Sequence, residues 1–365
     1  MGAGRMGSAG GRLGPSGHRI GPAVGQLLAV VRQCEASVES AKSVKSAKSA
    51  TLLRWLAGLG VAALSLWLLA RDLEWSSVLK ALASADYRWV AMGILAIIAT
   101  FFTRTRRWQA LLWHTSVPTR PAMTALLVGQ VVNLVLPMRS GDVARAAWIA
   151  PEKKTGFPEA LGSIAVEKVW DLLALLACGV VLLVWFPLPD WFARSTEGTA
   201  LALAVGGGAL WAGLHWQETL FRWAGRLLAR FPAGWDHALL SILRRLANGL
   251  EGLRRPSVSG RALFWTALTW GLGALANWAV LTAFGIPSAT AALFLLAALM
   301  VGGTVPVPGR LGLFEGICVL SLGLFGVPRD PALAVGLVLH LVVMGPPLVG
   351  AALLALWTGR KGEPR

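Results

Sequence analysis

Charged side chains follow directly on an apolar run in the stretch from Asn133 to Arg145. The stretch contains Arg139, Asp142 and Arg145, and a proline and a glycine within it interrupt helical backbone. Charge inside apolar sequence costs free energy unless it is paired or lines a wet cavity, so it marks a functional site by default. Interrupted backbone at membrane depth occurs only where protein or a cavity surrounds it. We interpret this stretch as half of a polar site inside a membrane protein.

A second interrupted stretch, Pro306 to Glu315, repeats the pattern nearer the C-terminus, with Arg310 as its cation. Each interruption precedes a short helix whose N-terminus favours anions. Guanidinium groups bind phosphate in a bidentate manner. We therefore expect the arginines of both stretches to meet at one anion-binding site. Asp142 and Glu315 are expected to pair with these arginines when the site is empty, and either is a candidate for proton coupling. The alternative for Arg139, Asp142 and Arg145 is a structural ion network that closes the loop, and for Glu315 it is helix capping or packing of the hairpin.

Other polar side chains are candidates for the same site. Glu167, Lys168 and Asp171 form a polar face at the start of a later apolar segment, where the alternative is a set of interfacial charges. Asn133 and Gln130 are candidates for contact with a headgroup, and hydrogen bonding between helices is the alternative.

The arginine cluster Arg104, Arg106 and Arg107 ends an apolar segment, and we interpret it as a cytoplasmic anchor that sets orientation. The chain has 365 residues, of which 55% are hydrophobic and 14% charged. Soluble domains carry about 25% charge, and several apolar runs here approach the roughly 20 residues that a membrane-spanning helix needs. The net charge of +16 is expected to lie in cytoplasmic loops that face anionic lipid. No nucleic-acid motif accompanies it, so nucleic-acid binding is not expected.

No cofactor or metal site is expected. The five histidines are scattered along the chain, and the three cysteines have neither metal-ligand spacing nor a disulfide framework.

Composition divides the chain into an arm, a membrane domain and a tail. Residues 1–50 are rich in Gly, Ser, Ala and Lys, which predicts a disordered basic arm. Residues 51–360 are predicted to form the transmembrane domain, and residues 361–365 a basic tail. Within the domain, residues 217–261 interleave arginines with apolar residues, which predicts a cytoplasmic amphipathic loop lying on an anionic leaflet.

These patterns predict an all-α polytopic membrane protein with about six full transmembrane helices and two re-entrant helical hairpins. The apolar segments on both sides of each interruption are short, and basic residues flank the first pair on the presumed cytoplasmic side. Two hairpins of opposite sense are typical of an inverted repeat, in which transport sites form near the midplane. The alternative is eight ordinary transmembrane helices. The predicted full spans are 52–70, 89–103, 157–186, 201–215, 262–284 and 333–357, and the hairpins are 121–149 and 289–325. We expect a cell-membrane location with both termini cytoplasmic.

Several motifs together indicate a known family. In order they are Arg104-x-Arg106-Arg107-Trp108, Gln130-x-x-Asn133, Leu136-Pro137-x-Arg139-x-Gly141-Asp142-x-x-Arg145, Glu167-Lys168-x-x-Asp171 and Pro306-x-Pro308-Gly309-x-x-Gly312-x-x-Glu315. With these motifs the chain resembles the lysylphosphatidylglycerol synthase transmembrane region, a flippase-like family, over about residues 50–360. The resemblance implies movement of a charged or glycosylated lipid between leaflets without a dedicated ATP-binding part. Members include the transmembrane half of enzymes that make lysyl-phosphatidylglycerol, and stand-alone proteins linked to other envelope lipids, polyprenyl-phosphate carriers and hopanoids.

The chain departs from that family at three points. The soluble aminoacyl-transferase domain is absent, so lysyl transfer is not expected. Gly309-Arg310 stands where the family usually reads Pro-Gly-Gly, which adds positive charge and questions the backbone geometry there. Lys168 stands where arginine is common, which weakens a bidentate role.

The sequence therefore predicts a lipid transporter rather than an enzyme, with membrane lipids as its partners. Arg139, Asp142, Arg145, Arg310, Glu315, Asn133, Glu167 and Asp171 are its predicted substrate-binding residues. Two alternatives remain at this point. One is an integral membrane enzyme acting on a lipid phosphate, and the other is an ion or small-solute carrier.

Overall fold

The computed structural model describes residues 71–135, 140–150, 156–185, 251–305 and 307–360, except residue 72, and single positions within 60–70 and 194–223. Every regular element that it describes is helical, which confirms the predicted all-α class. The predicted arm at 1–50, the tail at 361–365, Arg139 and most of the loop 217–261 lie outside the described residues.

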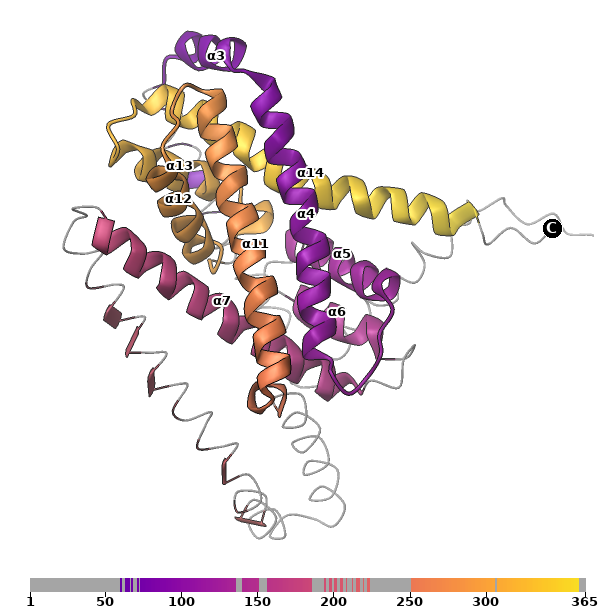
Figure 1. The fold of residues 1–365 in the computed structure, drawn as a ribbon. Coiled ribbons are helices and arrows are strands. Elements are labelled where there is room, and N and C mark those ends of the chain that lie inside the picture. The colour runs from indigo at the N-terminus through magenta and orange to yellow at the C-terminus, as the bar shows by residue number, and fades with distance from the viewer. Residues whose placement is uncertain are drawn as a thin grey trace, which may run out of the picture.

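Long helices frame the molecule and shorter ones fill the space between them (Figure 1). The long helices are α4 (Tyr87–Leu111), α7 (Phe157–Trp185), α11 (Pro256–Ala283) and α14 (Arg329–Arg360). The shorter ones are α3 (Trp75–Ser84), α5 (Thr119–Val135), α6 (Gly141–Ile149), α12 (Ala289–Gly302) and α13 (Leu313–Gly323). Two 3-10 turns, η1 (Glu251–Arg254) and η2 (Pro308–Arg310), precede α11 and α13.

Helix ends follow local capping chemistry. Asp86 precedes α4, and its carboxylate accepts a hydrogen bond from the backbone N–H of Arg88 at 3.0 Å. Ser288 precedes α12, and its hydroxyl accepts from the N–H of Ala291 at 3.2 Å. Each cap satisfies a backbone donor that has no partner within the helix, which is why aspartate and serine favour this position.

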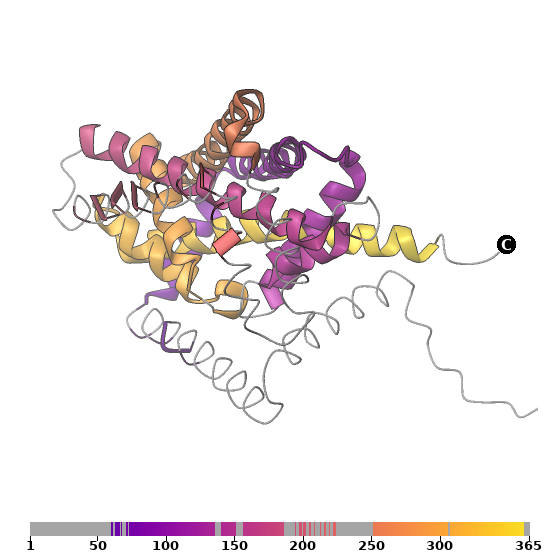
Figure 2. The same ribbon diagram turned by 90° about the horizontal axis from the view of Figure 1, so that it is seen from below.

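Helices α4 and α11 lie side by side along much of their length (Figures 1 and 2). The hydroxyls of Thr103 and Thr269 lie 2.7 Å apart across this pair, and the rings of Phe102 and Trp265 meet edge to face. Polar contacts of this kind help to fix one helix against another where the surroundings are apolar. The pair forms the wall on which the other helices pack.

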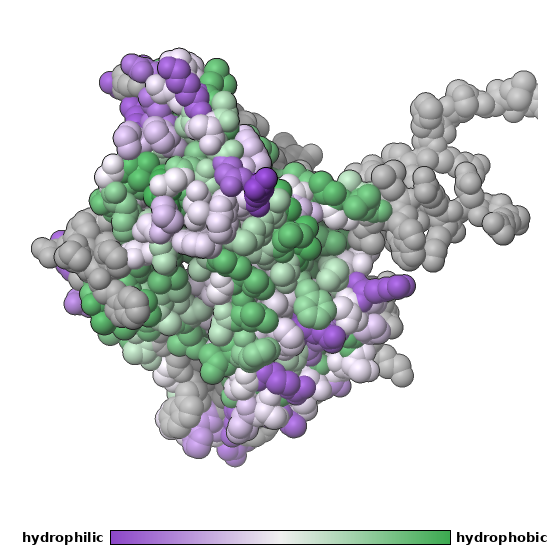
Figure 3. Space-filling model, turned by 45° about the horizontal axis from the view of Figure 1, so that its top comes forward, coloured by the Kyte–Doolittle hydropathy of each residue, from purple (hydrophilic) through white to green (hydrophobic). Residues whose placement is uncertain are grey.

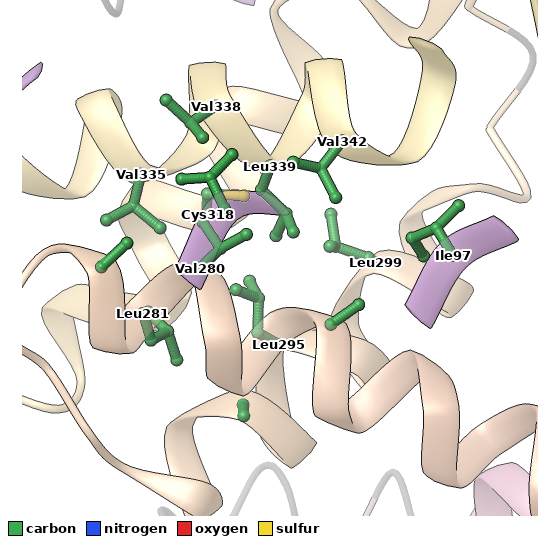
Figure 4. Close-up of a cluster of buried hydrophobic side chains, with 14 of the residues drawn as sticks. Ile97, Val280, Leu281, Leu295, Leu299, Cys318, Val335, Val338, Leu339 and Val342 are labelled. Carbon is green, nitrogen blue, oxygen red and sulfur yellow. The ribbon is translucent and has the colours of Figure 1, made fainter. Parts of the chain in front are cut away.

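The largest apolar core lies between α4, α11, α12, α13 and α14 (Figure 4). Its fully buried members include Val280, Leu281, Leu295, Cys318 and Leu339. In a bilayer the lipid tails are as apolar as these side chains, so close packing rather than removal from water holds such a core together. This core fixes α12 and α13 relative to the wall.

Apolar side chains also cover much of the outside. Figure 3 shows hydrophobic residues across the middle of one face and polar residues above and below them. Leu95, Val184, Leu320 and Leu341 are each at least 65% exposed. Of the described helices, Tyr87–Leu111 and the Arg329–Leu353 part of α14 are long and apolar enough to cross a membrane. An apolar exterior of this extent suits a lipid environment.

The structure differs from the predicted spans at α3 and at the C-terminal end of α4. Helix α3 lies where the sequence analysis placed only a loop. The predicted span 89–103 is too short, because α4 continues to Leu111 and carries the arginine cluster within its last two turns. The reason lies in the partners of these arginines.

Candidate functional site

A cavity of about 310 Å³ opens between α4, α5, α6, α7, α11, α12, η2 and α14. The first interrupted stretch contributes Asn133, Asp142 and Arg145 to its lining, and the second contributes Arg310. Asp171 from α7 lines it as well. The two stretches, far apart in the sequence, therefore border one space.

A buried ion network forms one side of this cavity, with Glu167 at its centre. Oε1 of Glu167 lies 2.9 Å from Nη2 of Arg107, and Oε2 lies 2.8 Å from Nη2 of Arg145. Arg107 also reaches Asp171, with Nη1 2.7 Å from Oδ1. Glu167, Arg107 and Arg145 are 0%, 1% and 2% exposed. Charges this deeply buried are tolerated only when paired, so the network holds α4, α6 and α7 in register.

A second ion pair, between Asp142 and Lys168, joins α6 to α7 at the edge of the cavity. Nζ of Lys168 lies 3.1 Å from Oδ2 of Asp142, and the two side chains are 43% and 28% exposed. A pair this open to its surroundings contributes little to stability. Asp142 thus has Lys168 as its partner among the described residues, and its expected pairing with an arginine of the interrupted stretches stays a prediction, because Arg139 lies outside those residues.

Arg145 has a prepared position and unused hydrogen-bonding capacity. Its guanidinium carbon lies 3.7 Å from the ring centroid of Trp108, and Nε1 of Trp108 donates to Ser163 at 3.0 Å. Nη2 of Arg145 lies 2.8 Å from Oε2 of Glu167 and is engaged in that ion pair. Nε of Arg145 is a buried donor with no hydrogen-bond partner among the described residues. Such a donor is rare in native structures, and a bound ligand is one explanation.

Two glycines and one amide hold α5 against α6. A Cβ at Gly129 would lie 2.7 Å from the carbonyl oxygen of Gly141, and a Cβ at Gly141 would overlap the carbonyl oxygen of Gly129. Oδ1 of Asn133 accepts a hydrogen bond from the N–H of Gly141 at 2.9 Å. Asn133 therefore bridges the two helices at the start of α6, which is the alternative that the sequence analysis kept open, while still lining the cavity.

The second interrupted stretch relies on unusual backbone. Gly309 and Arg310 both have positive φ, at 60° and 55°. Arg310 is the only non-glycine residue with positive φ in the described part of the chain, and that conformation is strained for a side chain with Cβ. Its guanidinium has room because residue 303 is glycine, where a Cβ would lie 3.1 Å from the guanidinium carbon. Arg310 therefore adopts a left-handed backbone conformation at a position where glycine is favoured.

Glu315 lies outside the cavity lining. Oε2 accepts from the N–H of Gly312 at 2.9 Å and so caps α13, while Oε1 lies 2.5 Å from Nδ1 of His340. The His340 ring stacks on Phe314 with centroids 4.7 Å apart. Both carboxylate oxygens are thus engaged, one by the α13 cap and one by His340 of α14, and the expected pairing of Glu315 with an arginine stays a prediction. A direct substrate contact at Glu315 stays a prediction.

A comparison with known protein families identifies the family of this chain. The model of the lysylphosphatidylglycerol synthase TM region matches residues 55–350. The chain belongs to this family. The resemblance inferred from the motifs is confirmed, and the protein is a membrane protein, since the family is a membrane domain.

A Haloferax volcanii protein named Glycosyltransferase AglD is similar to part of the chain. It is 29% identical over 157 residues, which cover 42% of this chain and 25% of that protein. This chain therefore spans about a quarter of the length of that relative. No solved structure matches the chain.

The buried pairing of Arg107 with Glu167 and Asp171 was not predicted from the sequence. The interpretation of the arginine cluster as a cytoplasmic anchor stays a prediction. Helical spacing held the missing signal. Residues three apart share a face, so Arg104 and Arg107 point one way while Arg106 points another. Arg104 and Arg107 line the cavity, whereas Arg106 is exposed against Phe102.

Metal-binding side chains are dispersed in the described part of the chain, where no group of three or more histidine, cysteine or acidic residues is placed to hold an ion. The site is thus built from guanidinium, ammonium, carboxylate and amide groups. These groups suit the binding of a charged or hydroxyl-rich headgroup.

Proposed function

We propose that this protein moves an anionic or glycosylated envelope lipid between the two leaflets of a membrane, with the headgroup in the cavity. The main support is Arg145, a buried guanidinium that lines the cavity and whose Nε has no hydrogen-bond partner among the described residues. A phosphate oxygen would satisfy this donor with a charge-assisted hydrogen bond. Sugar hydroxyls would find partners in the acidic and amide groups, Asp142, Asp171 and Asn133.

In this proposal the two interrupted stretches are re-entrant hairpins that enter from opposite faces. Helices α5, α6, α12 and α13 have 17, 9, 14 and 11 residues. At a rise of about 1.5 Å per residue, each is shorter than the roughly 30 Å hydrocarbon core. Interrupted helices that meet around a cavity near the midplane form the substrate sites of many transporters with inverted repeats. Arg310 brings a further cation to that site, and we place Arg139 there too.

The orientation of the chain belongs to the same proposal. We place the protein in the cell membrane with both termini cytoplasmic, and the basic loop 217–261 on the anionic cytoplasmic leaflet. Glu315 is proposed to act indirectly, by holding the second hairpin through its contact with His340.

The first test is reconstitution of the full chain into vesicles that carry a fluorescent anionic lipid. Movement is read from the fraction of label that a membrane-impermeant quencher reaches. We expect the native protein to speed movement, Arg145→Gln to abolish the gain, and exposed Arg106→Gln to leave it unchanged. Equal movement in empty and protein-containing vesicles, across a panel of phosphatidylglycerol, polyprenyl phosphate and glycosylated lipids, would end the transport proposal.

A second candidate is an enzyme that acts on a lipid phosphate, favoured by the printed name of the Haloferax volcanii relative. It predicts that the purified chain, given polyprenyl phosphate and a nucleotide sugar, forms a glycosylated lipid detectable by mass spectrometry. Lipid movement without such a product would favour transport.

A further inference from the structure

Resting on the proposed function, a second inference concerns the charge of the headgroup. We propose that Arg104 binds a phosphate of the headgroup, and that it makes the cavity select a headgroup of net negative charge over a zwitterionic or cationic one. Arg104 lies on α4 one turn before Arg107 and lines the cavity.

Arg104 differs from Arg107, Arg145 and Lys168 because no residue in the described part of the chain forms a direct pair with it. Its side chain is half-buried, and it makes no ion pair or hydrogen bond within the described part of the chain. A guanidinium has five N–H donors, and withdrawing it from water without partners costs free energy. A ligand that enters the cavity would meet these donors.

The carboxylates of Glu167 and Asp171 already form ion pairs with other cations, so neither is fully available as a partner for Arg104. Glu167 and Asp171 attract Arg104, while Arg107 and Arg145 repel it. The two oxygens of Glu167 face Arg107 and Arg145 at 2.9 and 2.8 Å. Both oxygens of Asp171 accept from Arg107, at 2.7 and 3.4 Å. Arg104 is therefore attracted electrostatically to both carboxylates but forms a direct ion pair with neither.

The sum of the charges on this side of the cavity also points to Arg104. The ion network contains three cations and three carboxylates: Arg107, Arg145, Lys168, Asp142, Glu167 and Asp171. The network is therefore neutral, and Arg104 adds one positive charge that none of its members balances. A headgroup with a net negative charge supplies that balance. A zwitterion adds no net charge, and a cationic aminoacylated headgroup would add repulsion in a site of low dielectric constant.

Arg145 lines the same cavity and its Nε has no hydrogen-bond partner among the described residues, so one phosphate group could bind both side chains. Two guanidinium groups around one phosphate are a common arrangement because each presents a planar pair of donors. The shared chemistry is phosphate, whether it belongs to a lipid or to a free anion, and the experiment below separates these two sources.

The test uses the purified full chain in phosphatidylcholine nanodiscs. Fluorescent phosphatidylglycerol is the anionic probe, lysyl-phosphatidylglycerol the cationic competitor and inorganic pyrophosphate the soluble competitor. We expect the native protein to bind phosphatidylglycerol about tenfold more tightly than lysyl-phosphatidylglycerol, since a charge-assisted hydrogen bond contributes about that factor. Arg104→Gln should lose this preference, Arg104→Lys should recover part of it, and Arg106→Gln should keep it.

A thermal-unfolding measurement separates binding from a structural role. Because Arg104 makes no direct pair and its burial costs free energy, Arg104→Gln should leave the unfolding midpoint unchanged or raise it, whereas loss of a structural arginine would lower it. Unchanged probe selectivity in Arg104→Gln, or no binding of either phosphate source to the native protein, would overturn this inference. Binding of pyrophosphate alone, lost in Arg104→Gln, would keep Arg104 as a phosphate ligand and overturn the lipid assignment. Selective lipid binding without movement between leaflets would remove the transport proposal but not this one.

Discussion

The two interrupted stretches have similar sequences but place their charges by different physical means. In the α5–α6 stretch, Arg145 is buried and relies on Glu167, a residue of another helix. In the α12–α13 stretch, Glu315 is satisfied by the backbone of Gly312 and by His340. The charged side chain of the first stretch is thus held by an ion pair across helices, whereas that of the second is held by a local cap and by His340 of α14.

The backbones of the two stretches differ as well. The first stretch is tight, because Gly129 and Gly141 allow the two helices to touch. The second keeps an arginine, Arg310, in a left-handed conformation where glycine is favoured. Packing therefore limits change in the first stretch, while conformational strain is present in the second. Four substitutions test this contrast.

The largest effect is expected at the centre of the ion network. Glu167→Gln would leave Arg107 and Arg145 buried without full compensation, and breaking a buried pair in this way costs about 3–5 kcal/mol. We expect a large fall in the unfolding midpoint, measured by thermal unfolding in detergent. Glu197→Gln, at an exposed position, is the matched control. Equal midpoints for the two variants would contradict a structural network.

Gly141→Ala tests the tight packing of the first stretch. The added Cβ would overlap the carbonyl oxygen of Gly129, so the helices must separate, and overpacking of this kind costs about 1–3 kcal/mol. The control lies in the second stretch, at Gly316, where nothing lies within 4 Å of an added Cβ. Gly316→Ala should be neutral or stabilising by up to about 1 kcal/mol, because alanine favours helix. Denaturant titration of both variants would show whether the two stretches differ as described.

Arg310→Gly separates strain from charge in the second stretch. Glycine adopts positive φ without a steric penalty, so we expect a gain of about 1 kcal/mol in stability together with slower lipid movement. Arg310→Ala removes the charge but retains Cβ, so it should slow movement without the gain in stability. The vesicle assay and thermal unfolding are both required. A less stable Arg310→Gly variant would show that its side-chain contacts outweigh the strain.

The smallest effect on stability is expected at the edge of the network. Asp142→Asn breaks the partly exposed pair with Lys168, and such pairs contribute about 0–1 kcal/mol. We expect a small loss in stability at low salt that disappears at high salt, because salt screens exposed charges. A loss as large as that of Glu167→Gln would mean that Asp142 belongs to the buried part of the network.

The sequence alone indicated much of this protein. Hydropathy and helix-breaking residues located the described helices closely, with the short helices on either side of both interruptions. Such features depend on neighbouring residues, so they can be read locally. Helix α3 was missed because its ten amphipathic residues are too few to form a membrane span, and the end of α4 was missed because three arginines resemble a helix terminus.

Tertiary structure decided which charges meet. Glu167 and Arg107 are 60 residues apart, and only the packing of α4 against α7 brings their side chains within hydrogen-bonding distance. The same packing buries Arg107, leaves Arg104 lining the cavity and turns Arg106 outward. Helical spacing separates Arg106 from Arg104 and Arg107, but which of the latter two forms an ion pair follows from the distance to a carboxylate on another helix, which no local pattern encodes.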